Sequence, residues 1–496
     1  MSQHLEFKRL ATGVPGLDEV LGGGLPEFSF NVIAGPPGCG KTTLAHQMMF
    51  ALASAGRPAL YFTVLGEPPL KMLRYQQQFE FYDTDAVNRS VRYVDLADAV
   101  AAGDFEPVLR RIAAEVGRQA PGLVFIDSFR SMGLAGSGGS SGAGGEAALQ
   151  RFVHDLGMLM TSWQATSFLI GEYATEGLSD PVFTVADGLI SLRQSVQRNS
   201  MVRKLEIVKM RGQATLPGLH SFRIAADGLH VFPPAATTTM TIETSPAAAS
   251  RRLPMGNARL DEMLGGGLPR GYSLLVAGPS GSGKSILAAA FLAEGARLGE
   301  GGVIAAFELR PGRSRNPLLA GLVAAGSVAV VDSSAPDLSI DEVVLLILDA
   351  VRRLRATRVV IDSLSGFELA LAPTFQDDFR ASLARLVVAL AASGVTVLMT
   401  CELEDRYTDL RFSPYGTAFL TDAIVLQRYV EIDSHLQRVM AVVKLRASAH
   451  CDELRAYTID DDGIHIGLAL AGEQGLLGGR PRRICEVLQA EAERAT

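Results

Sequence analysis

The chain has 496 residues, which is enough for two large domains or about three of average size. Its composition is 48% hydrophobic and 20% charged, with 51 glycines and 23 prolines, and this excludes a collagen-like, mucin-like or largely disordered chain. The formal charge of −7 at pH 7 does not favour an extended basic surface for duplex DNA or for an anionic membrane.

Short apolar runs alternate with longer segments of helical character in the first half of the chain. In chain order, these segments predict a strand over Phe28–Ala34, a helix over Lys41–Ala55 that ends at Gly56, strands over Ala59–Thr63 and Leu123–Ile126, a flexible glycine-rich loop over Gly133–Gly145, a helix over Gln150–Trp163 and a strand over Ser167–Ile170. The strand segments lack polar alternation, which is typical of parallel strands buried on both faces. The sequence therefore predicts a doubly wound, mostly parallel α/β sheet, which binds ligands beyond the carboxyl ends of its strands.

The chain contains the same pattern twice. Residues 12–26 return as residues 255–269, and the correspondence continues without a gap as far as Lys41 and Lys284. Further on, three charged residues recur in the same order, namely Asp127, Asp187 and Arg211 in the first copy and Asp362, Asp422 and Arg446 in the second. A repeat of this length is a duplicated domain, because each copy is large enough to form its own core.

The composition also predicts where the domains begin and end. We expect a first domain over residues 1–232, a linker over 233–252, a second domain over 253–468 and a C-terminal tail over 469–496. The linker is rich in proline, alanine and threonine and has no helical or alternating periodicity. The tail has the composition of a loose arm followed by a short amphipathic helix, which either docks a partner or frays.

The cysteines and the apolar runs indicate a cytoplasmic protein. Cys39, Cys401, Cys451 and Cys485 form no CxxC pair and the histidines are not clustered, which argues against a disulfide scaffold or a zinc site. The first residues have no apolar core of signal-peptide length, and no later run reaches the ~18 apolar residues needed to span a bilayer. We therefore expect neither export nor membrane insertion.

Each copy contains a glycine-rich P-loop of the form G-x-x-x-x-G-K-[S/T] between a predicted strand and a predicted helix. The first P-loop and the residue after it are Gly35, Pro36, Pro37, Gly38, Cys39, Gly40, Lys41, Thr42 and Thr43, and the second set is Gly278, Pro279, Ser280, Gly281, Ser282, Gly283, Lys284, Ser285 and Ile286. Backbone N–H groups of such a loop surround phosphate oxygens, its lysine reaches the β and γ phosphates, and its hydroxyl completes a Mg²⁺ shell. The sequence predicts two sites for Mg²⁺ and ATP, with Lys41 and Lys284 taking part in catalysis.

An aspartate follows a predicted strand in each copy, at Asp127 and at Asp362. With a P-loop in the same domain, each aspartate is expected to orient Mg²⁺ together with the hydroxyl of Thr42 or of Ser285. The alternative interpretation is that each aspartate caps the helix that follows, which is common at a strand-to-helix turn.

Hydrolysis or phosphoryl transfer also needs a group that positions the attacking oxygen. Glu308 ends a predicted strand of the second copy and is the candidate there. In the first copy the nearest carboxylate, Glu67, is displaced along the chain, and Glu172 and Glu402 follow later strands. The alternative for any lone glutamate is a solvated surface position.

A lysine and an arginine recur late in each copy, as Lys209 and Arg211 and as Lys444 and Arg446. Side chains two residues apart on a strand point to the same face, so each pair would deliver two positive charges to a phosphate. The alternative is the ordinary charge of an edge strand. The recurrence of the pair in both copies favours the phosphate-binding role.

Together these features resemble the KaiC family of tandem RecA-like ATPases over most of residues 5–468. The opening motif of that family, G-x-x-x-L-D-x-x-L-G-G-G-L-P, is present at 13–26 and 256–269, and the P-loops, the Asp-Ser strand ends and the Lys-x-Arg pairs also match. The resemblance implies a two-tiered hexameric ring with ATP bound at subunit interfaces. It implies further that the P-loops hold their own subunit's nucleotide, whereas the γ-phosphate of the neighbouring subunit is contacted by Lys209, Arg211, Lys444 and Arg446.

The chain departs from the family where catalysis is expected. Family members usually have Phe-Glu-Glu at the strand end of both domains, but the second copy has only Glu308, and the aligned pair in the first copy is Leu65-Gly66. Hydrolysis at the first site would therefore require Glu67 as a substitute.

A second departure concerns phosphorylation. Circadian members autophosphorylate an adjacent Ser-Thr pair just upstream of a Thr-Asp-x-Ile segment, and here those two positions are Ala418 and Phe419. Nearby hydroxyls at Ser413, Thr417 and Thr421 leave open a phosphorylation site at a shifted position.

The sequence thus predicts a KaiC-like protein that binds and hydrolyses ATP, forms nucleotide-dependent hexameric rings and signals to an unidentified protein partner. One alternative is a Ser/Thr protein kinase that acts on itself or on a partner. Another is a DNA-dependent RecA-type motor, which the net charge and the lack of an evident basic-aromatic tract disfavour.

Overall fold

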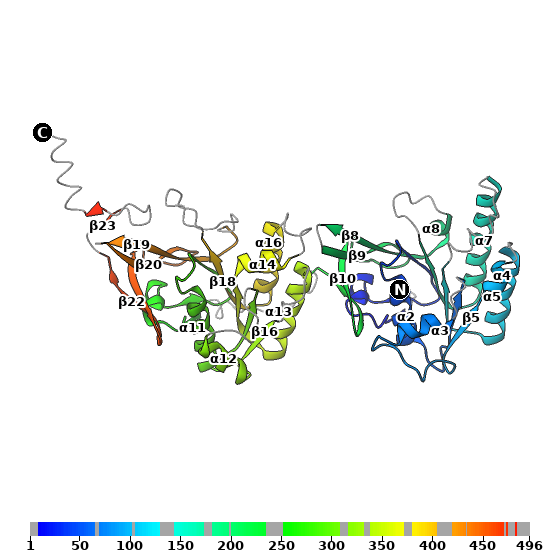
Figure 1. Ribbon diagram of the computed structural model, residues 1–496, viewed down its shortest axis with the longest axis horizontal. Helices are drawn as coiled ribbons and strands as arrows, with labels where there is room; N and C mark the ends of the chain where they lie inside the picture. Colours follow the sequence, from blue (N-terminus) through cyan, green and yellow to red (C-terminus); the bar gives the residue numbers. More distant parts are fainter. Residues whose placement is uncertain are drawn as a thin grey trace, which may run out of the picture. The chain divides into compact units, whose positions relative to one another are not determined.

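The computed structural model describes residues 8–64, 69–101, 105–128, 143–172, 181–197, 200–234, 251–307, 316–331, 338–371, 379–403, 419–432, 434–470, 473–474 and 482–483. Contacts within the chain divide it into two compact units, Met1–Pro234 and Ala235–Thr496, called unit 1 and unit 2 below (Figure 1). The predicted linker lies mostly outside the described residues, and so does most of the predicted tail.

Unit 1 is built on a nine-stranded sheet in the order β11-β10-β9-β8-β3-β7-β6-β4-β5. The pairs from β8 to β5 are parallel, and β9, β10 and β11 extend the sheet as antiparallel strands. Every residue of β3, β4 and β7 is buried, as expected for parallel strands covered on both faces. The strands are β3 (Phe30–Ala34), β4 (Ala59–Thr63), β5 (Val91–Asp95), β6 (Leu123–Asp127), β7 (Thr166–Gly171), β8 (Gly188–Gln197), β9 (Ser200–Met210), β10 (His220–Ala225) and β11 (Gly228–Phe232).

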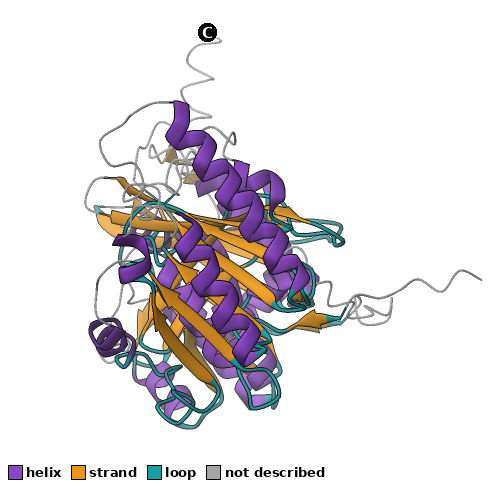
Figure 2. Cartoon of the chain, turned by 90° about the vertical axis from the view of Figure 1, so that its right-hand side faces the viewer, coloured by secondary structure: helices purple, strands orange, loops and turns teal. Residues whose placement is uncertain are grey.

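Helices cover both faces of this sheet and enclose a separate apolar core on each (Figure 2). Side chains alternate along β3, so that Ile33 packs with the helix α2 on one face while Val32 and Ala34 pack with α5 and α7 on the other. The helices are α1 (Leu17–Leu21), α2 (Lys41–Leu52), α3 (Pro69–Gln76), α4 (Ala97–Ala101), α5 (Phe105–Gln119), α7 (Ala143–Ser162) and α8 (Pro181–Val185). A short pair of strands, β1 (Arg9–Leu10) and β2 (Leu25–Pro26), precedes the sheet.

Unit 2 repeats this architecture, with the sheet order β16-β15-β17-β18-β14-β19-β20-β21-β22. Its strands are β14 (Ser273–Gly278), β15 (Gly301–Ala306), β16 (Val328–Val331), β17 (Ala356–Asp362), β18 (Thr396–Glu402), β19 (Ala423–Ile432), β20 (His435–Leu445), β21 (Arg455–Asp460) and β22 (Gly463–Ala469). Its helices are α10 (Ala258–Met263), α11 (Lys284–Arg297), α12 (Pro317–Ala324), α13 (Ile340–Leu354), α14 (Leu364–Ala370) and α16 (Phe379–Ala392). The short strand pairs are β12 (Arg252–Leu253) with β13 (Leu268–Pro269) and β23 (Glu473–Gln474) with β24 (Arg482–Arg483).

The predicted fold class is confirmed, and two predicted helix boundaries are wrong by several residues, while α7 ends at Ser162, one residue before the predicted end. Helix α2 ends at Leu52 rather than at Ala55, because Ala53 turns extended at ψ 138° and Ser54 pairs with Arg57 in an isolated bridge. Helix α7 begins at Ala143 rather than at Gln150, so the last residues of the predicted glycine-rich loop are helical. The remainder of that loop lies outside the described residues.

Two further features bear on the sequence predictions. Within the described part of the chain, no helix is both long enough and apolar enough to cross a membrane. Cys39, Cys401 and Cys451 are free thiols, and the first two are buried.

The core of unit 1 contains a histidine. The ring of His46, on α2, lies 4.4 Å from that of Tyr61 and 6.0 Å from that of Tyr93, measured between centroids. Its Nδ1 lies 2.8 Å from the carbonyl oxygen of Thr42, a distance at which a neutral imidazole donates a hydrogen bond. Burial lowers the pKa of His46 to about 4, because the charged ring would lose its hydration. The corresponding position of α11 is Ala289.

We predict that unit 1 loses stability as the pH falls from about 6.5 to about 4. In this interval the unfolded chain protonates its imidazole while the folded unit keeps His46 neutral, so the unfolded state binds more protons. A pKa lowered from 6.5 to about 4 corresponds to about 3 kcal/mol of unfolding free energy. The chain has a single tryptophan, Trp163 in unit 1, so urea unfolding followed by its fluorescence reports this unit in the full chain.

The control is His46→Phe, which keeps an aromatic ring and removes the titration. Its unfolding free energy should fall less steeply over the same pH interval. Equal pH dependence in the variant and the parent chain would contradict the assignment.

Candidate functional site

The first P-loop connects the end of β3 to the start of α2. Gly38 and Gly40 have φ angles of 75° and 104°, in the left-handed region that favours glycine. Gly40 is the N-cap of α2, so the loop ends where the unpaired N–H groups of a helix N-terminus begin. Such an end attracts anions through its N–H groups and through the helix dipole. A Cβ on Gly38 would find only one atom within 4 Å, at 4.0 Å, so this glycine borders open space.

The P-loop lysines adopt the same geometry in both units. Lys41 Nζ donates hydrogen bonds to the carbonyl oxygens of Gly35 at 2.9 Å and Pro36 at 2.8 Å. Lys284 Nζ donates to the equivalent oxygens of Gly278 at 2.9 Å and Pro279 at 2.8 Å. Gly283, the N-cap of α11, is left-handed like Gly40, with φ 95°. The predicted repetition of the P-loop therefore extends to the placement of its lysine.

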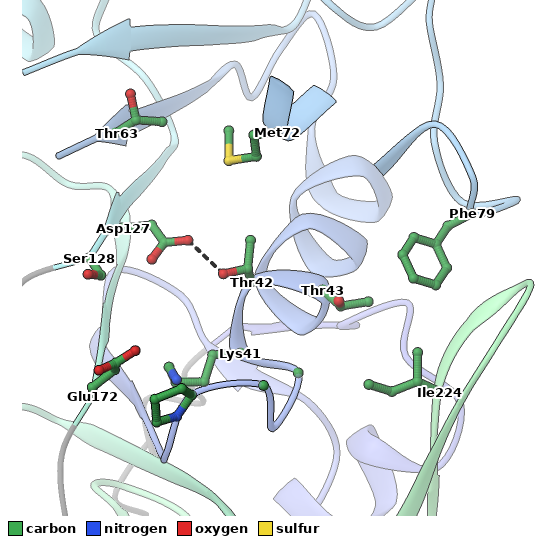
Figure 3. Close-up of a pocket in the computed structure, with 13 residues that line it drawn as sticks. Lys41, Thr42, Thr43, Thr63, Met72, Phe79, Asp127, Ser128, Glu172 and Ile224 are labelled. Carbon is green, nitrogen blue, oxygen red and sulfur yellow. Dashed lines mark hydrogen bonds between the residues drawn. The ribbon is translucent and has the colours of Figure 1, made fainter. Parts of the chain in front are cut away.

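Asp127, at the carboxyl end of β6, lies beside the first residues of α2. Thr42 Oγ1 donates a hydrogen bond to Asp127 Oδ2 at 2.8 Å (Figure 3), and the hydroxyl of Tyr61 donates to the same oxygen at 2.8 Å. Burial raises the pKa of Asp127, while these two hydrogen bonds and the charge of Lys41 oppose the rise. The threonine hydroxyl and the carboxylate are hard oxygen donors of the kind that Mg²⁺ prefers, and a Mg²⁺ ion needs few protein ligands beside phosphate and water. The donor set therefore fits Mg²⁺.

In unit 2, Asp362 ends β17 and Ser363 follows it. The N-cap of α14 is Ser363, whose hydroxyl accepts a hydrogen bond from the N–H of Gly366. The alternative interpretation of Asp362 as a helix cap is therefore wrong, because the serine has that role. Asp362 Oδ1 instead accepts a hydrogen bond from the hydroxyl of Thr400.

A pocket of about 480 Å³ surrounds the start of α2 in unit 1. Its lining residues are Pro37, Gly38, Gly40, Lys41, Thr42, Thr43, Thr63, Met72, Phe79, Asp127, Ser128, Glu172 and Ile224. Asp127, Ser128 and Glu172 lie on one side of α2, whereas Phe79 and Ile224 lie beyond Thr43 on the other (Figure 3). The pocket thus has a polar end beside Asp127 and a more apolar end beside Phe79.

The structure brings some of the predicted residues together and leaves others apart. Of the residues predicted to bind nucleotide and metal in unit 1, those that line the pocket are Pro37, Gly38, Gly40, Lys41, Thr42, Thr43 and Asp127. The predicted carboxylates Glu67 and Glu308 lie outside the described residues. Lys209 and Arg211 do not line the pocket of their own unit.

The arginines of the Lys-x-Arg pairs are anchored in the same way in both units, whereas the lysines donate to carbonyl oxygens at different positions. Lys209 Nζ donates to the carbonyl oxygens of Phe183 at 3.1 Å and Thr184 at 3.2 Å, and Arg211 forms an ion pair with Asp187 at 3.2 Å. Burial, followed by the charge of Arg211, lowers the pKa of Lys209.

In unit 2, Lys444 donates to the carbonyl oxygen of Thr421 at 2.6 Å, and Arg446 pairs with Asp422 at 3.3 Å. The arginine side chains remain 58% exposed at Arg211 and 51% exposed at Arg446. Each pair therefore presents an arginine to the surface of its own unit.

Several lining residues carry no local sequence signal. Met72 and Phe79 come from the segment after β4, and Ile224 from β10, so only the folded sheet brings them to the P-loop. Tyr61 lies within an apolar run, where its pattern predicts a core residue and not a partner of Asp127. Glu172, which follows β7, is a lining residue whose position after a strand is visible in the sequence.

Two nine-stranded, mostly parallel sheets, each with a P-loop between a central strand and a helix, define a tandem RecA-like P-loop nucleoside triphosphatase. The family model described as the KaiC ATPase matches residues 10–236 and 253–470. The chain therefore belongs to the KaiC ATPase family and is a nucleotide-binding protein.

Curated relatives match over nearly the whole length. The chain is 26% identical to the circadian clock oscillator protein KaiC of Rippkaea orientalis, over 96% of this chain and 92% of the relative. It is 26% identical to the circadian clock protein KaiC3 of a Synechocystis species, over 98% of this chain and 97% of the relative. It is also 26% identical to the KaiC of a Picosynechococcus species, over 98% and 95%.

We predict that Gly40→Ala weakens nucleotide binding in unit 1. An alanine at φ 104° is strained by about 1 to 2 kcal/mol, and its Cβ would lie 2.8 Å from Ile224 Cδ1. We expect roughly tenfold weaker binding of a fluorescent ADP analogue in a Lys284→Ala background, which corresponds to ~1.4 kcal/mol. The control, Gly56→Ala, adds a methyl group with no atom within 4 Å and should bind like the parent. Equal affinities for both variants would refute the role of the Gly40 conformation.

Proposed function

We propose that the chain is a Mg²⁺-dependent ATPase whose bound nucleotide stabilises a hexameric ring and whose nucleotide state is signalled to a protein partner. The observation that carries the proposal is the repeated P-loop geometry, with Lys41 and Lys284 placed alike. Membership of the KaiC family and relatives named as circadian clock proteins support the ring and the signalling role.

The residues of the pocket have distinct tasks in this proposal. The N–H groups before and within the first turn of α2 hold the β and γ phosphates, and Lys41 leaves its loop carbonyls to neutralise them. Thr42 and Asp127 hold Mg²⁺, which when bound offsets charge on the phosphate oxygens. Met72, Phe79 and Ile224 form the more apolar end of the pocket, which suits the flat face of a nucleotide base.

The two units differ in the groups available for turnover. Glu308 follows β15 in unit 2, whereas Leu65 and Gly66 occupy the aligned positions in unit 1. We therefore assign the main turnover to unit 2, with Glu308 as the group that positions the attacking water. Unit 1, in which Glu67 follows the aligned positions in the sequence and Glu172 lines the pocket, mainly binds nucleotide and stabilises the assembly by mass action.

In this proposal, the nucleotide of a neighbouring subunit is contacted by Lys209, Arg211, Lys444 and Arg446. Their anchoring to α8 and Asp187 in unit 1, and to Thr421 and Asp422 before β19 in unit 2, holds them away from their own P-loop. The guanidinium groups of Arg211 and Arg446 keep about half of their surface exposed beside their aspartate partners, and this exposed part can contact another chain. An arginine supplied in this way stabilises the charge that develops on the transferred phosphoryl group.

The structure gives no support to an autokinase that uses the acceptor pair of the circadian proteins. Neither Ala418 nor Phe419 has a hydroxyl group. The ring of Phe419 is 51% exposed and lies 4.7 Å from the guanidinium carbon of Arg380, so this position serves a packing contact.

We predict that Lys284→Ala abolishes most ATP turnover, whereas Lys41→Ala keeps most turnover and weakens assembly. Lys284→Ala removes the phosphate-binding cation of unit 2, to which we assign turnover. Lys41→Ala removes the equivalent cation of unit 1, which mainly binds nucleotide. Phosphate release and native mass spectrometry with and without MgATP measure the two effects on the same samples. The parent chain should shift from small species to a hexamer with ATP.

Two results would contradict this division of tasks. One is equal loss of turnover in the two variants, which would make both units catalytic. The other is an assembly mass of the parent chain that does not respond to ATP, which would remove the role of nucleotide in ring formation.

We predict that Arg446→Ala and Lys284→Ala chains complement each other. Arg446→Ala alone should reduce turnover at least ~100-fold, because it lacks the arginine that reaches the neighbouring site. In mixed rings, a Lys284→Ala subunit supplies an intact Arg446 to the intact P-loop of an Arg446→Ala subunit, so part of the turnover returns. The measurement is phosphate release after mixing the two chains at equal concentration.

The control partner carries both substitutions in one chain. It has no intact Arg446 to offer, so mixing it with Arg446→Ala should restore nothing. Full activity of Arg446→Ala alone, or no recovery in the mixture, would rule out a contribution between subunits.

A further inference from the structure

The aspartate to which we assign metal binding in each unit accepts a hydrogen bond from a buried hydroxyl. In unit 1 the hydroxyl belongs to Tyr61, which donates to Asp127 Oδ2 at 2.8 Å. The same oxygen accepts the hydrogen bond of Thr42 at 2.8 Å. Two hydroxyl groups, one from β4 and one from α2, therefore converge on a single carboxylate oxygen and fix the rotation of the carboxylate.

In unit 2 the hydroxyl comes from the opposite neighbour of the aspartate strand. Strand β6 lies between β4 and β7, and the equivalent β17 lies between β15 and β18. Asp362 accepts its hydrogen bond from Thr400 on β18, whereas Asp127 accepts from Tyr61 on β4.

The sheet register shows that the polar and apolar positions are exchanged. Tyr61 pairs with Phe125 in β6, and the equivalent pairing in unit 2 is that of Ile304 with Val360. Asp127 pairs with Ile170 in β7, which is the position that Thr400 occupies relative to Asp362. At these two pairs of equivalent positions, unit 1 has Tyr61 and Ile170 and unit 2 has Ile304 and Thr400. The residues directly in register with Asp127 on β4 and with Asp362 on β15 are Thr63 and Ala306.

Packing holds the Tyr61 hydroxyl in place. The side chain is fully buried, and its ring packs against those of His46 at 4.4 Å and Phe125 at 5.9 Å, measured between centroids. A tyrosine has only two side-chain dihedral angles, so a packed ring leaves its hydroxyl little freedom to follow a moving carboxylate. Tyr61 is thus a rigid support behind Asp127.

We propose that Tyr61 is a positioning residue that holds Asp127 in the orientation required for Mg²⁺ and nucleotide, and that Thr400 has this task for Asp362. The proposal rests on the proposed function of the P-loop sites. Groups that hydrogen-bond to the groups around a metal commonly change its affinity 10- to 100-fold when they are removed. Without the Tyr61 hydroxyl, Asp127 loses one of two donors and Thr42 loses a fixed acceptor for its proton.

The test measures metal binding directly, in the full chain with Lys284→Ala to weaken the second site. Mn²⁺ replaces Mg²⁺, and electron paramagnetic resonance follows the loss of free Mn²⁺ as it binds with ADP. Tyr61→Phe removes one oxygen and keeps the ring. We expect its Mn²⁺ dissociation constant to rise roughly tenfold, while ADP affinity measured in EDTA changes little.

Tyr93→Phe is the matched control. Tyr93 is partly buried and packs against the same core, with its ring 5.4 Å from that of Tyr61. Among the described residues its buried hydroxyl has no hydrogen-bond partner. This variant should bind Mn²⁺ like the parent. The loss in Tyr61→Phe should be largely restored by adding Ile170→Thr, which supplies a hydroxyl from β7 as Thr400 does in unit 2.

The outcomes separate this inference from the proposed function. An unchanged Mn²⁺ constant in Tyr61→Phe, or an equal rise in Tyr93→Phe, would overturn the role of Tyr61 while the parent chain still binds the metal and ADP. A parent chain that binds neither would instead overturn the proposed function. Thermal unfolding of each variant identifies a general loss of structure. If the Tyr61→Phe/Ile170→Thr variant does not fold, the comparison of Tyr61→Phe with Tyr93→Phe still tests the role of Tyr61.

Discussion

The hydrogen bond between Thr42 and Asp127 is the contact on which the site depends, and the order of the strands makes it possible. Thr42 follows β3 and Asp127 ends β6, and only β7 separates these two strands in the sheet. Because the three strands are parallel, their carboxyl ends meet at one edge, where the P-loop, the aspartate and Glu172 surround one pocket. Unit 2 has the same strand order, with β14, β18 and β17 in the same relation.

Much of the sequence repeat serves this framework and does not line the pocket. In the opening motif, the carboxylate of Asp18 accepts the N–H of Thr12, and that of Asp261 accepts the N–H of Met255. A Cβ on Gly24 would lie 2.5 Å from the carbonyl oxygen of Leu10, so only glycine lets the two short strands of unit 1 approach. The recurring residues therefore specify the fold twice, and the differences between the two sites lie in residues that do not recur.

The sequence predicts those parts of the fold and the site that local patterns encode. Continuous apolar runs predict β4 at its observed bounds, and the glycine spacing predicts the loop before α2. The end of α2 was not predictable, since it depends on the turn that leads into β4. The contact of Tyr61 with Asp127 was not predictable either, because a tyrosine in a buried strand has the same pattern whether its hydroxyl meets a carboxylate or, like that of Tyr93, meets nothing among the described residues.

The hydroxyl donor and the isoleucine occupy exchanged positions in the two units, and this difference bears on the function that unit 1 has. Loss of one donor to a buried carboxylate costs about 1 to 3 kcal/mol. Ile170 cannot supply the donor that Thr400 supplies to Asp362, and Tyr61 supplies one to Asp127 from the other neighbouring strand. Such compensation has value only if the orientation of Asp127 matters in unit 1. Leu65 and Gly66 occupy the aligned positions of the family's catalytic glutamates in that unit. Unit 1 therefore has a hydroxyl that orients its aspartate but lacks those glutamates. This combination favours a first site that holds metal and nucleotide and a second site that carries out turnover.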